Sequence, residues 1–292
     1  MRNHILDRPR LYGWTLKVTR TLPKPVLYAF ARIVGGLVFV FSRHDRRVVS
    51  HNLNIVLRGQ PSSKHPRRLL WQFFQNYAFY LVDFFRLLSM TLEESASFAQ
   101  LYEGRRYLDE ALDKGRGAIL LTAHLGHWEI GGLGLRALGY PVNVVTIKHN
   151  SFFTNNLINL MRSRHGIRVI ELGNSTYDVI EIVNALHRNE VVAVLGDRAI
   201  SERSGTATLF GREVQLPLGP LLLAMTTRAP VVPAFSVMEA PGRYCGIIEK
   251  ALYFQNGRDR EQAMKHNLQQ VASVFERYIR RYPDQWFQTE CI

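Results

Sequence analysis

The sequence predicts an α/β fold, in which a mixed, mostly parallel sheet is flanked by helices and preceded by a helical N-terminal region. Short apolar runs, typical of buried strands, alternate with helical segments from Gly104 onward. The apolar content of 47% in 292 residues is sufficient for a full core. The chain up to about Ala99 has helical patterning instead. We therefore expect a helical, membrane-associating region at 1–103 and an α/β core at 104–292, together forming one continuous domain.

The N-terminal region begins with an apolar stretch at Val26–Phe41. It is short for a spanning helix and contains Arg32, so it is expected to lie at a membrane interface or in the core. Three arginines follow it directly. A membrane surface suits that order, because apolar side chains enter the bilayer and arginines meet phosphates, but a core helix with a solvated basic end fits as well. The arginines are Arg43, Arg46 and Arg47.

A second helix is predicted at Lys64–Leu88, where apolar and aromatic residues recur at helical spacing. Its aromatic density exceeds the need of one buried face. Burial on several sides is favoured over contact with lipid or an acyl chain.

The core is expected to alternate strands and helices. Strands are predicted at Ala118–Thr122, Val142–Ile147, Ile167–Ile170, Val191–Leu195, Val231–Val237 and Tyr244–Ile248. Helices are predicted at Phe153–His165, Thr176–Arg188 (capped by Ser175), Pro217–Thr227 and Asp259–Arg281. Functional residues of such a sheet gather where its strands end and loops begin.

The segment from His124 to Glu129 directly follows the first predicted strand of the core. If a helix starts there, Glu129 can accept a proton from one imidazole nitrogen while the other nitrogen faces a substrate hydroxyl. Such a base activates a hydroxyl for attack on an ester or thioester. Two alternatives are a partly buried histidine at a helix start and a metal site formed with His127. The zincin spacing His-Glu-x-x-His is absent, so no metal ion or other cofactor is expected.

Further polar candidates lie near other predicted strand ends. Asp197 and Arg198 follow the strand at Val191–Leu195, where the arginine can clamp a phosphate or form a structural ion pair. The small-residue run Ser204–Gly211 is expected to be flexible and to shape a pocket wall, including Gly211. Three more cations could hold phosphate or be solvated surface charges. They are Lys148, Arg162 and Arg164.

Composition and missing motifs limit the classes of function. The net charge of +13 favours a polyanionic partner, such as nucleic acid, an acidic carrier protein or anionic lipid. The charge is dispersed and no nucleic-acid-reading motif is found, so a nucleic-acid-binding protein is the weaker alternative. The sequence has no Gly-x-Ser-x-Gly, Walker or Gly-x-Gly-x-x-Gly motif, which favours direct attack without a covalent intermediate. The two cysteines, Cys245 and Cys291, suggest a reducing compartment.

Six blocks in order resemble the bacterial lipid A late acyltransferase family, which belongs to the wider glycerolipid acyltransferase superfamily. The central block is the His-x4-Glu segment Thr122–Glu129, where His127 stands in place of the family's usual asparagine. The others are Arg46–Leu53, Asp197-Arg198, Phe210-Gly211 with Pro217–Pro220, Ala229–Pro233 and the C-terminal Tyr282–Trp286. The Pro217–Pro220 run also resembles phosphatidylinositol mannoside acyltransferases.

The resemblance implies transfer of a fatty acyl chain from a thioester to a hydroxyl of a membrane glycolipid or phospholipid. His124 would be the base and Glu129 its partner. The donor would be acyl carrier protein or acyl-coenzyme A, and the phosphate contacts would include Arg198 and Lys148. The resemblance implies a location at the cytoplasmic face of the inner membrane, held peripherally or by one N-terminal anchor.

Overall fold

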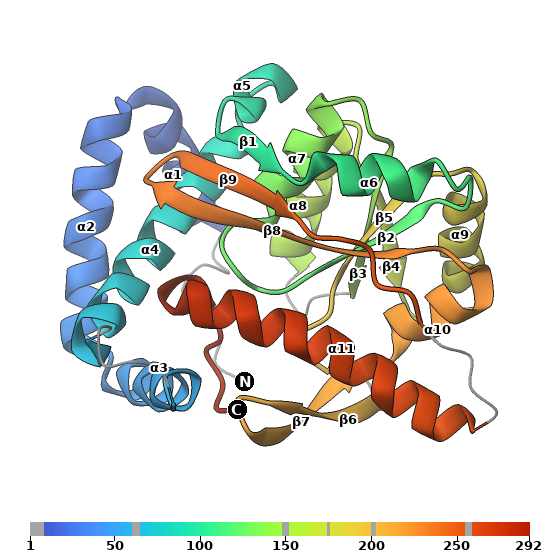
Figure 1. Cartoon of the computed structure of the whole chain (residues 1–292). Helices are drawn as coiled ribbons and strands as arrows, with labels where there is room; N and C mark the ends of the chain where they lie inside the picture. The colour runs from blue at the N-terminus through green and yellow to red at the C-terminus, as the bar shows by residue number, and fades with distance from the viewer. Residues whose placement is uncertain (1–8, 60–64, 148–151, 174–175, 200–202, 255–258) are drawn as a thin grey trace.

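The computed structural model describes residues 9–59, 65–147, 152–173, 176–199, 203–254 and 259–292. Helices form the first part of the chain, as the sequence predicts, and most of them lie to one side of the sheet in Figure 1. In order they are α1 (Pro9–Thr21), α2 (Lys24–Phe41), α3 (Arg43–Val56), α4 (Pro66–Leu87) and α5 (Leu92–Ala96).

A sheet with the strand order β1-β9-β8-β2-β5-β3-β4 forms the centre of the described part of the chain. Every neighbouring pair is parallel except β8 and β9, so the prediction of a mixed, mostly parallel sheet is confirmed. The strands are β1 (Ala99–Glu103), β2 (Ala118–Thr122), β3 (Val142–Ile147), β4 (Arg168–Leu172), β5 (Val191–Leu195), β8 (Val231–Ala240) and β9 (Arg243–Ile248).

Helices cover both faces of the sheet, and β2 has a different layer of core on each side. Ile119 and Leu121 point into the layer that contains Phe275 of α11, whereas Leu120 points into the layer that contains Ile130 of α7. Successive side chains of a strand alternate between faces, so one apolar strand supplies both layers. The helices of the core are α6 (Arg105–Leu112), α7 (Trp128–Ala137), α8 (Phe152–Arg164), α9 (Thr176–His187), α10 (Gly219–Thr227) and α11 (Arg260–Arg281).

A separate antiparallel hairpin, β6 (Ser204–Leu209) and β7 (Arg212–Pro217), packs against α11. One prediction is wrong here, and one predicted helix start is displaced by two residues. The run at Ser204–Gly211 is a strand and its turn, because Ala207 and Leu209 are buried while Thr206 and Thr208 face solvent. Pro217 ends β7, and the helix predicted to begin there starts at Gly219.

Helix α2 packs along α4 through a narrow stripe that contains Gly35. A Cβ on Gly35 would lie 3.0 Å from the carbonyl oxygen of Phe74, so the two helices approach closely. Only 17% of α2 is buried, and within the described residues it is the one helix long and apolar enough to cross a membrane. Its exposed apolar side chains include Val26, Phe30, Ile33, Val34, Leu37, Val38, Val40 and Phe41.

The division of the chain at residues 103 and 104 stays a prediction. Strand β1, which precedes that boundary, is an edge strand of the central sheet and pairs in parallel with β9.

Candidate active site

The register of two neighbouring strands positions the site. In the parallel pair of β2 and β5, Thr122 lies opposite Leu195. His124 and Asp197 each follow two residues later, so they emerge side by side at the carboxyl edge of the sheet. Carboxyl ends of parallel strands are the usual location of functional side chains in open α/β sheets.

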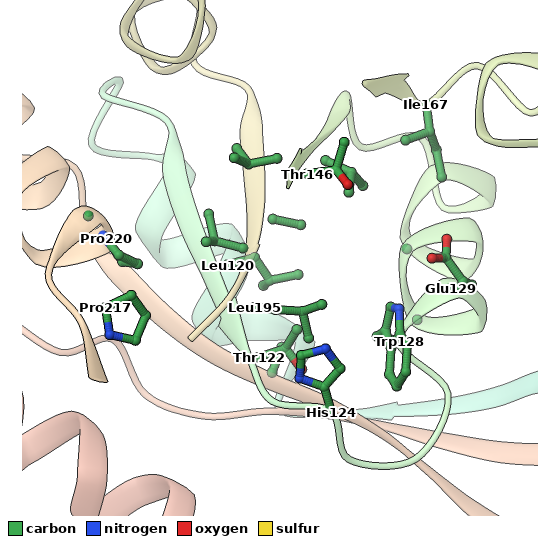
Figure 2. A pocket seen from close by; sticks show the side chains of 18 of the residues that line it. Leu120, Thr122, His124, Trp128, Glu129, Thr146, Ile167, Leu195, Pro217 and Pro220 are labelled. Atoms are coloured by element: carbon green, nitrogen blue, oxygen red, sulfur yellow. The ribbon is translucent and has the colours of Figure 1, made fainter. Parts of the chain in front are cut away.

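The imidazole of His124 is held by Asp197. His124 Nδ1 lies 2.7 Å from Oδ1 of Asp197, and the backbone N–H of His124 donates to Oδ2 at 3.1 Å. An ionised carboxylate only accepts hydrogen bonds, so in the neutral form of the ring Nδ1 carries the proton and Nε2 has the lone pair. Figure 2 shows the ring of His124 at one end of a pocket. The arrangement is that of a base with its orienting acid.

Asp197 is ionised although it is buried. Burial raises the pKa of its carboxyl group, but His124, Arg198 and the indole N–H of Trp286 outweigh burial and lower it to about 2. The Nε1–H of Trp286 donates to Oδ2 at 3.0 Å. Asp197 is therefore a fixed negative charge beside the base throughout the neutral pH range.

The C-terminal segment clamps the loop that carries His124. Phe287 N–H donates to the carbonyl of His124 at 2.9 Å, and Gly126 N–H donates to the carbonyl of Gln285 at 2.9 Å. On the other side, His127 N–H donates to the carbonyl of Ser236 in β8. Gly126 has a φ of +66°, and a Cβ there would come within 1.9 Å of the Ser236 oxygen, so only glycine fits. The sequence marked Tyr282–Trp286 as a family block but did not predict that Trp286 holds Asp197.

The predicted contact between Glu129 and His124 is wrong. Glu129 pairs with Arg162, which donates through Nη2 at 2.5 Å and through Nε at 3.0 Å. Both side chains are less than a tenth exposed. Figure 2 shows the carboxylate of Glu129 directed away from the imidazole, with Trp128 near the histidine. The loop clamp explains the difference: it separates the two residues, so α7 begins only at Trp128 and turns Glu129 toward α8.

A cavity of about 870 Å³ opens beside His124. Most of its wall is apolar and comes from the strands β2, β3 and β5 and the helices α7 to α10. Such a volume is in the upper range for ligand sites in proteins. Representative lining residues are Leu120, Leu135, Val144, Ile158, Leu172 and Leu223. The buried pair Glu129–Arg162 also lines it, so the wall is apolar except at a few fixed positions.

Only some of the residues predicted to contact phosphate line the cavity. Arg198 lines the cavity and donates through Nη2 to the carbonyl of Phe287 at 2.6 Å, while its buried Nε has no partner among the described residues. Arg162 lines the cavity, but Glu129 occupies its guanidinium. Arg164 is exposed outside the cavity lining, and Lys148 lies outside the described residues.

Two further residues differ from their predicted setting. Gly211 is not in the cavity lining and lies in the turn between β6 and β7, with a φ of +75°. Arg203, which the sequence did not single out, lines the cavity and is exposed to solvent. Whether any of these residues contacts substrate stays a prediction.

His127 lies fully buried beside the site, between the rings of Tyr80 and Tyr244. Neither ring nitrogen has a hydrogen-bond partner among the described residues. Burial lowers the pKa of His127 to about 3, so the ring is neutral. Within the described part of the chain, no group of three or more His, Cys, Asp or Glu side chains is arranged to hold a metal ion.

Comparison with known proteins identifies the family. The sequence model of the bacterial lipid A biosynthesis acyltransferases matches residues 9–289. The chain belongs to this family. It is therefore an acyltransferase of lipid biosynthesis, with an acyl donor and a lipid acceptor, and it transfers an acyl group to a glycolipid. The resemblance predicted from the sequence is confirmed.

Curated relatives of this acyltransferase are phosphatidylinositol mannoside acyltransferases. The protein from Mycobacterium tuberculosis (strain CDC 1551 / Oshkosh) is 28% identical over 235 residues, which cover 79% of this chain and 72% of the relative. The protein from Mycolicibacterium smegmatis is 27% identical over 236 residues, which cover 79% of this chain and 74% of the relative.

Proposed function

We propose that this acyltransferase moves a fatty acyl chain from a thioester to a hydroxyl of a membrane glycolipid, with His124 as general base. Nε2 of His124 takes the proton of the acceptor hydroxyl as its oxygen attacks the thioester carbon. The tetrahedral intermediate then expels the thiolate, which receives the proton from the imidazolium. Asp197 holds the ring and stabilises its charged form. The observation that carries this proposal is the 2.7 Å contact between His124 and Asp197 at the end of an apolar cavity.

The cavity is suited to hold the acyl chain. Its aliphatic wall accepts a hydrocarbon, and transfer of each methylene from water to such a wall is favourable by about 0.8 kcal/mol. The chain would enter beside His124, which places the thioester carbonyl near the base. No nucleophilic serine or cysteine of the described residues is required, because the acceptor oxygen attacks directly.

Positive charge near His124 supports a donor or acceptor that carries phosphate. Arg198 and Arg203 both line the cavity. An acyl chain on acyl carrier protein or coenzyme A is attached through a phosphopantetheine arm, so either donor fits. Arg198 Nε is also a buried donor without a partner among the described residues, and it is available to a developing oxyanion.

The acceptor class follows from the relatives. The family and the curated relatives are named for lipid A and phosphatidylinositol mannosides, so we propose an anionic membrane glycolipid as acceptor. A lysophospholipid is the alternative acceptor. The apolar face of α2 supports attachment to a membrane surface, for which we propose the cytoplasmic face of the inner membrane.

Turnover of the His124→Ala variant tests the proposal. Consumption of an acyl thioester is measured in the presence of a competent acceptor. General-base catalysis contributes roughly 10²–10⁴-fold, so the variant is expected to lose that factor in kcat. The matched control is His266→Ala, because His266 is exposed on α11 away from the cavity lining. Turnover near that of the wild type in His124→Ala would refute the role of the base.

Lipids from a deletion strain identify the acceptor. Mass spectrometry is expected to show one glycolipid that lacks one acyl chain and that regains it when the wild-type gene, but not His124→Ala, is restored. Loss of an acyl chain from a phospholipid instead would favour the lysophospholipid alternative.

A further inference from the structure

A basic groove lies on α3 and the start of α4, apart from the cavity beside His124. It has a volume of about 840 Å³ and is open to solvent. Its cationic lining residues are Arg43, Arg46, Arg47 and Arg67, and no acidic residue is among the described residues that line it. The groove therefore concentrates positive charge on one surface.

The arginines of the groove differ in their contacts within the protein. Arg46 donates to the carbonyls of Phe39 and Val40 and so caps the C-terminus of α2. Arg43, Arg47 and Arg67 are exposed and have no hydrogen bond or ion pair among the described residues. Asp45, on the same helix, accepts a hydrogen bond from Ser42 Oγ at 2.5 Å. Three guanidinium groups are thus available to a ligand.

The groove begins where the apolar face of α2 ends. Phe30, Ile33, Leu37 and Phe41 recur at helical spacing along α2, and all are more than half exposed. Phe41 is 77% exposed and stands two residues before Arg43. Apolar side chains followed at once by arginines match the order of hydrocarbon and phosphate layers at a bilayer surface.

We propose that Arg43, Arg47 and Arg67 form a binding site for the phosphate of an anionic membrane lipid. Guanidinium groups bind phosphate through paired N–H donors, and α2 enters the hydrocarbon beside them. An acidic protein would satisfy the arginines but would leave the apolar face of α2 in water. A membrane covers both surfaces, so a lipid fits the observations better.

This site would also orient the enzyme. The opposite face of α3 is buried through Val49 and Leu53, and Asn52 donates from Nδ2 to the carbonyl of Glu290 at 2.8 Å. The same C-terminal segment carries Trp286, which holds Asp197. A lipid phosphate on α3 would thereby be linked, through this hydrogen bond and the C-terminal segment, to the catalytic loop, and it would fix the cavity relative to the membrane.

Vesicle co-sedimentation tests the site. The triple variant Arg43→Gln/Arg47→Gln/Arg67→Gln is compared with the wild type on phosphatidylcholine vesicles with and without phosphatidylglycerol. We expect its affinity for the anionic vesicles to fall roughly 10- to 100-fold, and the salt dependence of binding to flatten. The matched control, Arg116→Gln/Arg168→Gln/Arg260→Gln, removes the same charge from three exposed arginines outside the groove, and it should bind within about twofold of the wild type.

Two results would overturn the proposal. One is equal loss of affinity in both triple variants, because net charge alone would then explain binding. The other is normal vesicle binding by the groove variant together with weaker binding of an acidic acyl carrier protein in detergent. The lipid site rests on one part of the proposed function, namely that the enzyme acts at a membrane surface. Vesicle binding does not require turnover. His124→Ala is therefore expected to bind vesicles like the wild type, which separates the two failures.

Discussion

Two buried carboxylates beside the same cavity have different surroundings. Asp197 contacts the imidazole of His124 and the indole N–H of Trp286, so it is bonded to the loop that carries the base. Both carboxylate oxygens of Glu129 accept hydrogen bonds from the guanidinium group of Arg162. Glu129 is five residues from His124 along the chain, whereas Asp197 is 73 residues away. Strand register, rather than distance along the chain, therefore determines which carboxylate contacts the imidazole of His124.

The difference also separates two physical roles. A carboxylate bonded to a histidine sets its tautomer and supports its positive charge during turnover. A buried carboxylate bonded to an arginine mainly avoids an uncompensated charge. Because both acids line or adjoin the cavity, loss of activity alone does not distinguish them. Measurements of stability and spectroscopy distinguish the two roles.

The largest expected effect comes from Asp197→Asn. The asparagine amide would donate to Nδ1 of His124 and move the proton to Nε2, where the base needs a lone pair. We expect kcat to fall roughly 10³–10⁴-fold, by analogy with acids that orient a catalytic histidine. The measurement is thioester turnover at saturating acceptor. Asp113→Asn, at an exposed carboxylate, is the control, and a fall of less than tenfold in Asp197→Asn would remove Asp197 from the mechanism.

The second effect is on stability and concerns Glu129 with Arg162. Glu129→Gln leaves a buried guanidinium without its counter-charge, which costs about 3–5 kcal/mol in free energy of unfolding. The double variant Glu129→Gln/Arg162→Met removes both charges and should be more stable than the sum of the two single variants predicts. Chemical denaturation of the four proteins measures this coupling. Additive changes would show that the pair is not energetically linked.

The third effect is a pH dependence of stability from His127. Its pKa is about 3 in the folded protein and about 6.5 in an unfolded chain, so the unfolded state binds a proton first as the pH falls. The stability contributed by the neutral ring is complete above pH 6.5 and is lost as the pH falls toward 3. Between pH 7.5 and 5.0 the His127→Asn variant should lose about 2 kcal/mol less than the wild type. Equal losses of stability in the wild type and in His127→Asn would show that the ring of His127 is charged or hydrated in the folded protein.

The smallest effect comes from Trp286→Phe, which keeps an aromatic ring but removes the N–H donor to Asp197. The lost bond raises the pKa of Asp197 and loosens its orientation. We expect a fall in kcat of roughly tenfold, since a hydrogen bond to a charged group contributes about 1.5 kcal/mol. Trp71→Phe on α4, at a partly exposed indole, is the control. A kcat unchanged in Trp286→Phe, with a normal pH profile, would leave Trp286 a purely structural role.

Much of the fold could be predicted because local patterns determine it. The strands at Ala118–Thr122, Val142–Ile147 and Val191–Leu195 have the predicted bounds, since each is a short run of mostly apolar residues. The hairpin at Ser204–Pro217 was missed. Its small residues suggest flexibility, but the alternation from Thr206 to Leu209 is the signal of a half-buried strand.

The position of His124 at a strand end was predictable, but its partner was not. Each of His124 and Asp197 follows its strand by two residues, a shared offset that is visible in the sequence. It becomes informative only when β2 and β5 are known to be neighbours. That adjacency depends on contacts between distant segments, and the order of the parallel strands is not set by local pattern. The roles of Trp286 and Arg203 depend on the same long-range packing.

The hydrogen bond of His124 Nδ1 tests the central assignment most directly. In protein labelled with ¹⁵N-histidine, the Nδ1–H proton of His124 is assigned by its absence in His124→Gln. The account predicts a downfield resonance that persists in folded Glu129→Gln and disappears in Asp197→Asn. A resonance that survives Asp197→Asn and is lost in Glu129→Gln would contradict it.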